Sequence, residues 1–314
     1  MRVPGLADKR LLYVTGKGGV GKSTVAIALG IAAARRGLRT IVAELTGQDR
    51  AAVAFGHADG SSGARELQLD ANLFAISIEP QHALEEYLAQ RAGPFGDLLA
   101  GSRTFHGFVS ATPGMRELLA LGKAWELAQP QRRTPGGEPY DLVIVDAAAT
   151  GHGVGALKTP RTFAEIAKVG PIAGQGRALD ESFSDPSFTA VVAVALAEEM
   201  PVNETLTLRQ RLRDELGIEL AQTIVNALVP DRLGPRQAAT VVRAAEQAGD
   251  ASPLVRVALE SARSEHVRAR AQRAQVQRLA LGLASDPLEL PYLFAPSVDR
   301  DGLDALATHL DVVL

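Results

Sequence analysis

The stretch Gly16-Lys17-Gly18-Gly19-Val20-Gly21-Lys22-Ser23-Thr24 follows the apolar run 11–14 and precedes a run rich in Ala, Leu and Ile that ends at Arg36. This order predicts a strand, a glycine-rich loop and a helix. Glycines let several backbone N–H groups turn inward around one anion, and the N-terminus of the helix adds free donors and the positive end of its dipole. The stretch therefore predicts a loop that binds a chain of phosphates, with every residue from Gly16 to Thr24 beside it.

Two side chains make this prediction specific for a nucleotide with a terminal phosphate. In the pattern G-x-x-x-x-G-K-S, the lysine, here Lys22, meets the β- and γ-phosphates, and the serine, here Ser23, holds Mg²⁺. A turn that only reverses the chain needs neither residue. We therefore expect ATP or ADP and Mg²⁺ as cofactors, with Lys22 among the catalytic residues.

The same glycines also fit a dinucleotide-binding pattern. Gly16, Gly18 and Gly21 spell G-x-G-x-x-G, and Glu44 ends the next apolar run as a ribose-binding acid would. A dinucleotide loop, however, binds a bridging pyrophosphate with backbone groups and has no use for a Lys-Ser pair. The pair Lys22-Ser23 favours the terminal phosphate and its metal ion.

Composition excludes several other kinds of site. The 314 residues are 46% hydrophobic, which is ample for a core, and the formal net charge of −3 provides no general field for nucleic acid. There is no cysteine, which excludes disulfides, thiolate metal sites and a cysteine nucleophile. We find no apolar signal core in residues 1–10 and no run of membrane-spanning length, so we expect a cytoplasmic protein with no nucleic acid partner.

Strand-like and helix-like segments alternate along the chain, which predicts an α/β fold with a mostly parallel, doubly wound sheet and helices on both faces. We expect one domain over residues 1–314. The expected strands are 11–14, 40–44, 73–78, 140–146, 188–196, 220–227 and 288–290. The expected helices are 23–36, 80–91, 203–216, 236–248, 254–284 and 301–313.

Two segments, about 93–129 and 155–186, interrupt this alternation and predict an added helical subdomain. The first carries apolar or small residues at helical spacing after a looser apolar group at Phe105, Phe108 and Val109. The spaced residues are Met115, Leu118, Leu119, Gly122, Trp125 and Ala128. Two interpretations stay open: the segments bind a client, or they only cover the core of their own domain.

A second chemical segment, Asp146-Ala147-Ala148-Ala149-Thr150-Gly151-His152, directly follows a buried strand. An acid at the carboxyl end of a parallel strand lies next to the first strand-to-helix loop, where Asp146 can hold Mg²⁺ directly or through water. The loop beyond Asp146 is expected to move when the γ-phosphate is lost. His152 is either a residue that reports on this phosphate or a simple polar loop residue.

These motifs also carry a family resemblance. With its extra lysine, Lys17, the loop is similar to the deviant phosphate loop (deviant Walker A) of a group of dimeric P-loop ATPases. That group includes the arsenical-pump, tail-anchored-protein-targeting, nitrogenase-iron-protein, septum-site and chromosome-partition families. The segment 146–152 resembles the D-x-A-P-T-G-H switch of the arsenical-pump (ArsA) and targeting (Get3) branch, and the segment 194–205 is similar to that branch's strand-to-helix segment. The stretch 112–123 resembles the shorter, cysteine-free members of actinobacteria.

The resemblance implies partners and further site residues. Two subunits, identical or related, meet across their nucleotides in this family, and Lys17 would reach the phosphates of the partner's ATP as a catalytic residue. Asn226 would end the strand that contacts adenine, and Pro291 would be the proline of the purine loop. A hydrophobic client or a membrane protein would be a further partner.

The chain departs from the family at the first switch, whose usual S-T-D-P-A-H carries an acid that orients the attacking water. Without gaps, the acid's position falls on Thr46, and Gly47 replaces the proline. Glu44 lies too near the strand end, and Asp49 is available only if the loop is rearranged. Asp49 is the acid we expect to be catalytic. Slow hydrolysis, or none, therefore stays open, and Ala149 in place of the second-switch proline makes that loop less rigid.

Three function classes follow. The first is an ATP-dependent dimeric switch of the ArsA and Get3 branch that handles a client. The second is a positioning ATPase that acts on a membrane or DNA, although residues 301–314 carry acids and no lysine, and the arginines of 254–284 are mixed with alanines and acids. The third is a nucleotide-binding subunit that has lost hydrolysis and pairs with a related chain.

Overall fold

A computed structural model describes residues 5–45, 47–57, 65–92, 112–134, 136–147, 150–167 and 171–314 of the chain. At the centre of these residues lies an eight-stranded sheet in the order β3-β4-β2-β5-β1-β6-β7-β8. Strand β3 is antiparallel and lies at one edge, and the other neighbours are parallel. The strands are β1 (Leu11–Gly16), β2 (Thr40–Glu44), β3 (Leu67–Asp70), β4 (Leu73–Ser77), β5 (Leu142–Asp146), β6 (Thr189–Leu196), β7 (Leu220–Leu228) and β8 (Leu288–Pro291). The predicted mostly parallel α/β sheet is confirmed.

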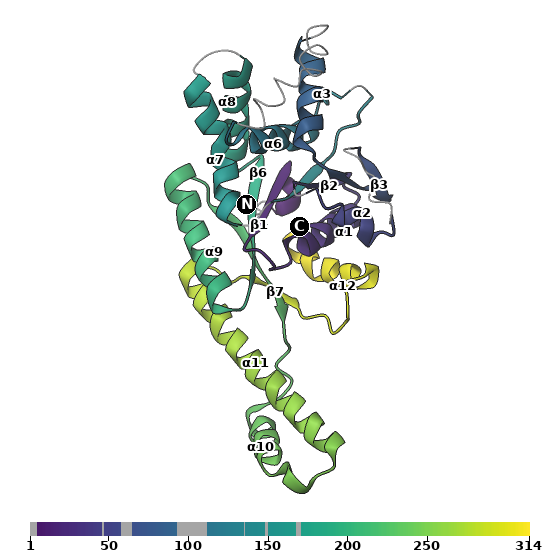
Figure 1. The fold of residues 1–314 in the computed structure, drawn as a ribbon, viewed down its shortest axis with the longest axis vertical. Coiled ribbons are helices and arrows are strands. Elements are labelled where there is room, and N and C mark those ends of the chain that lie inside the picture. Colours follow the sequence, from purple (N-terminus) through teal and green to yellow (C-terminus); the bar gives the residue numbers. More distant parts are fainter. Residues whose placement is uncertain are drawn as a thin grey trace.

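Helices cover both faces of this sheet (Figure 1). Helices α1 and α12 pack together on one face, and α3, α6, α7 and α9 contribute to the core on the other face. The α-helices of the described residues are α1 (Lys22–Arg35), α2 (Arg50–Ala54), α3 (Pro80–Ala92), α6 (Met115–Leu127), α7 (Thr150–Ala167), α8 (Pro171–Ser184), α9 (Glu199–Arg211), α10 (Pro235–Glu246), α11 (Pro253–Leu283) and α12 (Arg300–Leu310). In the described ranges, none is both long enough and apolar enough to cross a membrane.

The central strands are buried on both faces because successive side chains of a strand point to opposite sides of the sheet. In β1, Leu11 and Tyr13 belong to the core that α6 and α7 cover, whereas Leu12 and Val14 belong to the core under α1 and α12. Helix α1 lies so close to the sheet that a Cβ on Gly30 would meet Val42 Cγ2 at 2.8 Å. This packing fixes α1 directly after the glycine-rich loop.

Helix α10 and the N-terminal part of α11 project away from the sheet (Figure 1). With a rise of 1.5 Å per residue, α11 is about 45 Å long. Its buried residues lie in its C-terminal half and are Ala269, Gln272, Val276, Leu279 and Leu283. Near its start, Leu254 and Val257 are exposed. The sequence predicted these helices but not that they form a projecting arm.

Several boundaries differ from the sequence prediction. The chain beyond Asp146 was expected to be a loop, but α7 already begins at Thr150, because burial of Val154 and Leu157 outweighs the low helix propensity of its glycines. Strand β3 was missed because it is an edge strand of only four residues, too short to give a clear periodic pattern. Helix α9 begins at Glu199 rather than 203, and its continuation, Leu212–Leu216, is a π-helix.

The stripe expected on the first added segment is largely buried within this chain. Met115, Leu118 and Trp125 of α6 belong to the same core as β1 and β5. The Trp125 indole N–H donates a hydrogen bond to Ser182 Oγ of α8 at 2.8 Å. For residues 115–128, the stripe therefore covers the core. Phe105, Phe108 and Val109 lie outside the described residues, and the division into a domain and a client-binding subdomain stays a prediction.

A cluster of buried charges ties α6 to the edge of the sheet. Arg132, whose side chain is 1% exposed, contacts Glu66 Oε1 at 2.5 Å and Glu126 Oε1 at 2.9 Å. Tyr140 donates a hydrogen bond to Glu66 Oε2 at 2.7 Å. Burial acts to raise the pKa of Glu66 and Glu126, but hydrogen bonds and charge from Arg132 outweigh it and hold both pKa values below the ordinary 4.5. Lys123 of α6 also contacts Glu86 of α3 at 2.6 Å.

Arg132→Met should lower the free energy of unfolding by about 3 kcal/mol at neutral pH, because it removes the cation shared by the buried Glu126 and the partly buried Glu66 and leaves only Lys123, 3.4 Å from Glu126 Oε2. The stabilisation from lowered carboxyl pKa values is present above pH 4.5 and is lost as the pH falls through the lowered folded values, so the variant should lose less stability in acid than the wild type. Urea unfolding across this pH range measures both effects.

The matched control is Arg213→Met, which removes an exposed partner of Glu219 and should cost no more than about 1 kcal/mol. Adding Glu66→Gln and Glu126→Gln to Arg132→Met should recover part of the loss. Equal stability of the two single arginine variants would contradict the structural role of Arg132.

Candidate functional site

The loop between β1 and α1 packs against β6 and β7. A Cβ on Gly16, whose φ is +149°, would collide with the carbonyl oxygen of Val194 in β6. A Cβ on Gly21, whose φ is +89°, would collide with the side-chain amide of Asn226 in β7. Only glycine fits at these two positions, which explains why the loop carries its backbone so close to the carboxyl ends of the strands.

Lys22 and Ser23 are the first two residues of α1. Lys22 is half-buried, and its Nζ donates a hydrogen bond to the carbonyl oxygen of Lys17 at 3.0 Å, so it curls back over the loop. Burial lowers the pKa of Lys22, while the charge of Asp146 opposes this shift. Ser23 is buried. The predicted phosphate lysine and metal-binding serine therefore lie at the helix N-terminus, where anions are favoured.

Asp146 ends β5 and lies opposite Val14 of the neighbouring β1. It is 1% exposed. Burial raises its pKa, and a hydrogen bond with Ser23 and the charges of Lys22 and Arg50 oppose that shift. Among the described residues, none gives a hydrogen bond to the buried Asp146 Oδ2. The fold thus brings together residues from two separate segments, as the sequence predicted.

This donor set fits Mg²⁺. Magnesium prefers oxygen ligands and is commonly held by one or two protein oxygens together with waters and phosphates. Ser23 Oγ and Asp146 Oδ2, which receives no hydrogen bond from the described residues, are oxygens of that kind. Within the described ranges, no group of three or more His, Cys, Asp or Glu could hold a metal ion.

The acids of the first switch differ in what they contact. Glu44, at the end of β2, is 2% exposed, and its carboxylate accepts hydrogen bonds from the backbone N–H of Arg50 at 3.0 Å and of Ala51 at 2.7 Å. Glu44 therefore caps α2. Burial raises its pKa, and these two N–H groups oppose that shift. Asp49 precedes α2 with a φ of +47°, and Thr46 lies outside the described residues.

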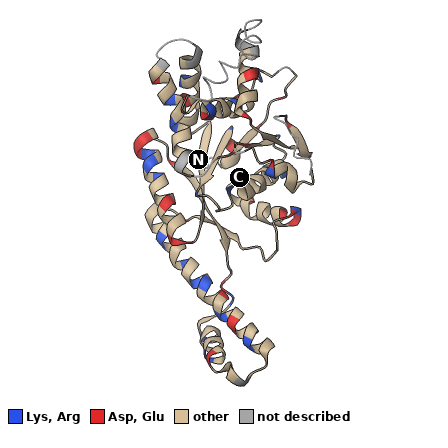
Figure 2. Ribbon diagram, viewed as in Figure 1, with Lys and Arg blue, Asp and Glu red and all other residues tan. Residues whose placement is uncertain are grey.

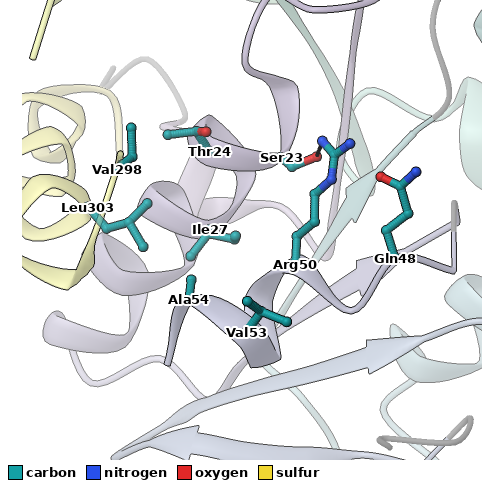
Figure 3. A pocket seen from close by; sticks show the side chains of 9 residues that line it. All are labelled: Ser23, Thr24, Ile27, Gln48, Arg50, Val53, Ala54, Val298 and Leu303. Atoms are coloured by element: carbon teal, nitrogen blue, oxygen red, sulfur yellow. Dashed lines mark hydrogen bonds between the residues drawn. The ribbon is translucent and has the colours of Figure 1, made fainter. Parts of the chain in front are cut away.

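Arg50 is a site residue that sequence reasoning missed. Its Nη1 donates a hydrogen bond to Ser23 Oγ at 2.9 Å, and its charge acts on both Lys22 and Asp146. It lines a pocket between α1, α2 and the start of α12, where its guanidinium lies beside Ser23 (Figure 3). No motif signals Arg50, because its position follows from the fold of the switch segment and not from local spacing.

Lys17 contacts α9 of the same chain. Its Nζ forms an ion pair with Glu204 and lies 2.8 Å from Met200 Sδ. The sequence predicted that Lys17 faces away from its own loop toward a partner. The side chain does point away from the loop, and Glu204, part of the segment used for the family resemblance, holds it there. Its action on a partner's nucleotide stays a prediction.

The remaining predicted residues lie at the ends of β7, β8 and β5. Asn226 of β7 donates a hydrogen bond from Nδ2 to the carbonyl oxygen of Val20 at 3.0 Å, which ties β7 to the loop. Pro291 ends β8 beside Leu228. Their contacts with adenine stay predictions. His152 lies in the first turn of α7, and its side chain is outside the described part of the chain.

Comparison with known proteins identifies relatives over most of the chain. The anion-transporting ATPase family matches residues 9–175 and 164–247. The chain is 30% identical to the ATPase BagA of Mycobacterium tuberculosis, over 79% of this chain and 73% of that protein. It is 29% identical to the ATPase GET3 of Kluyveromyces lactis, over 70% of this chain and 72% of that protein.

A further relative is a putative arsenical pump-driving ATPase of Halobacterium salinarum, which is 30% identical over 72% of this chain but only 37% of its own length. These relatives confirm the resemblance to the ArsA and Get3 branch that the glycine-rich loop and the segment after β5 indicated. The chain belongs to the anion-transporting ATPase family.

Proposed function

We propose that this protein binds ATP and ADP with Mg²⁺ and hydrolyses ATP slowly, as a switch whose nucleotide state controls binding of a partner. The observation that carries the proposal is the meeting of Lys22 and Ser23 with the buried Asp146 beside a glycine-rich loop. Membership of an ATPase family supports it.

Each residue has a physical role in this proposal. The backbone N–H groups of residues 16–24 and the N-terminus of α1 bind the phosphates. Lys22 places its charge on the β- and γ-oxygens, where negative charge spreads during phosphoryl transfer. Ser23 and Asp146 hold Mg²⁺, which when bound neutralises phosphate charge.

We propose slow hydrolysis because the first switch lacks a well-placed acid in the family pattern. The Glu44 carboxylate is occupied by two backbone N–H groups of α2. Asp49 is the acid that we propose orients the attacking water, and its left-handed backbone keeps it at the start of α2. An acid three residues away from the family's position, Thr46, orients the water less well, and orientation provides much of the rate enhancement.

We further propose that two subunits, identical or related, close over their nucleotides, with Lys17 reaching the partner's phosphates. The ion pair with Glu204 supports this proposal, because it holds the Lys17 side chain away from its own loop before the subunits close. When the subunits close, Lys17 exchanges the carboxylate of Glu204 for the partner's triphosphate, which carries more negative charge. From the family resemblance, we also propose a hydrophobic client or a membrane protein as a partner. The added segments of this chain would provide the surface that binds it.

A nucleic acid partner has little support. Along α11, two glutamates, Glu260 and Glu265, are interspersed among the arginines of its N-terminal half (Figure 2). Arg263 pairs with Glu260 at 2.9 Å, and Arg273 pairs with Glu289 at 2.5 Å. These two arginines are already paired with acids and so do not add to the unopposed basic stripe that phosphate backbones require.

Lys22→Ala should abolish Mg-ATP binding, raising the dissociation constant at least about 100-fold, because charge-assisted hydrogen bonds to phosphates are lost. Isothermal titration calorimetry with a non-hydrolysable ATP analogue measures this loss. Lys158→Ala, which removes an exposed lysine paired with Glu215, is the matched control and should bind like wild type. Equal affinity of Lys22→Ala and wild type would overturn the proposed ATP site.

Lys17→Ala should leave ATP binding to the monomer nearly intact and weaken nucleotide-dependent dimer formation by roughly tenfold, as expected for a charge pair lost from a buried interface. Glu204→Gln should have the opposite effect, because it releases Lys17 from its partner in the same chain. Light scattering with the analogue measures the dimer. Undiminished dimer formation by Lys17→Ala would leave Lys17 no role between subunits.

A further inference from the structure

The guanidinium of Arg50 contacts the oxygen of Ser23 that would bind a metal ion. A metal ion bound to Ser23 would therefore lie close to this guanidinium. The guanidinium donates to Ser23 Oγ at 2.9 Å, and Ser23 lies beside Asp146, where both Ser23 and the charge of Arg50 act to lower the pKa of that carboxyl. Arg50 thus provides a positive charge to the two side chains that fit Mg²⁺. If both contacted Ser23 Oγ, a guanidinium and a divalent cation would lie close together and repel each other strongly.

The backbone of Arg50 is held as well as its side chain. It is the first residue of α2, and its N–H and that of Ala51 donate to the buried Glu44. Helix α2 is therefore tied to the end of β2 through Glu44 and to the start of α1 through the Arg50 side chain. The second tie depends on Ser23, a residue that Mg²⁺ would also use.

The side chain of Arg50 can leave this position at modest cost. Arg50 is exposed overall, and it lines a pocket together with Gln48 and Val53 (Figure 3). A long, exposed side chain that makes one hydrogen bond to the described residues through its end has alternative rotamers available. The Glu44 bonds to α2 do not prevent such a rotation, because they involve only backbone groups.

We propose that Arg50 and Mg²⁺ exclude each other at Ser23, so that metal binding changes how firmly α2 is held. Without metal, Arg50 holds Ser23, compensates the charge of Asp146 and ties α2 to the loop. When Mg²⁺ arrives with the nucleotide, the guanidinium leaves and this tie is released. The inference rests on the proposed nucleotide site and adds a residue that sets how strongly metal and nucleotide binding are coupled.

The test compares ADP affinity by calorimetry in saturating Mg²⁺ and in EDTA. The ratio of the two affinities measures the coupling between metal and nucleotide. Arg50→Gln should raise this ratio by a factor on the order of ten, within the usual range for coupled binding. Arg50→Lys keeps the charge and should stay near the wild-type ratio. Arg36→Gln is the matched control, since it removes an arginine that pairs with Asp311 beyond the other end of α1.

Hydrogen exchange of backbone amides measures whether the contact between Arg50 of α2 and Ser23 is lost. In wild type, amides of residues 47–57 should exchange faster with ADP and Mg²⁺ than with ADP and EDTA. In Arg50→Gln, exchange should be fast in both conditions. Both results together support mutual exclusion.

Two outcomes would overturn the inference alone. If Arg50→Gln weakens ADP binding equally with and without Mg²⁺, Arg50 contacts phosphate and does not compete with the metal. If it changes neither ratio nor exchange, Arg50 is a surface residue without this role. If wild type binds no ADP in either condition, the proposed function fails, and the inference fails with it.

Discussion

Contact between the glycine-rich loop and the neighbouring strands fixes the geometry on which the site depends. Gly16 lies against the backbone of β6, and Gly21 lies against Asn226 of β7. Neither position leaves room for a Cβ, which shows that the loop packs tightly against both strands. Moving the loop outward would lose these contacts. The close contact sets where α1 begins, and with it the positions of Lys22 and Ser23.

Two buried acids at neighbouring strand ends show how the same residue type takes different roles. Glu44 of β2 and Asp146 of β5 lie opposite each other in the sheet. Glu44 satisfies its carboxylate with two backbone N–H groups and so stabilises α2. Asp146 keeps one oxygen without a hydrogen bond from the described residues and has cations nearby. Burial of a charge is costly unless it is compensated, and here the compensation separates a structural acid from one that is available to a metal ion.

The added helix α6 belongs to the body of the protein as much as to any subdomain. Its apolar face is part of the core, and Lys123 and Glu126 join it to a network of buried charges. A surface for a partner on this segment would therefore have to use other residues than its apolar stripe. The projecting pair α10 and α11 leaves more side chain surface exposed, with Leu254 and Val257 near its end.

By itself, the sequence determined the phosphate-loop motif, most strands of the sheet and the acid after β5. These features depend on local patterns: glycine and lysine spacing, and apolar runs of strand length. It also predicted the α/β class, because strands and helices alternate along the chain. The family followed from the same short motifs.

Only the tertiary structure decided which distant residues meet. The contacts of Arg50 with Ser23, Lys17 with Glu204 and Arg132 with Glu66 join residues that are 27, 187 and 66 positions apart. Such contacts depend on strand order and helix packing, which short-range periodicity does not encode. The roles of Glu44 as a helix cap and of Arg50 beside the oxygens that we propose bind Mg²⁺ therefore became visible only when the sheet brought β2, β5 and β1 side by side.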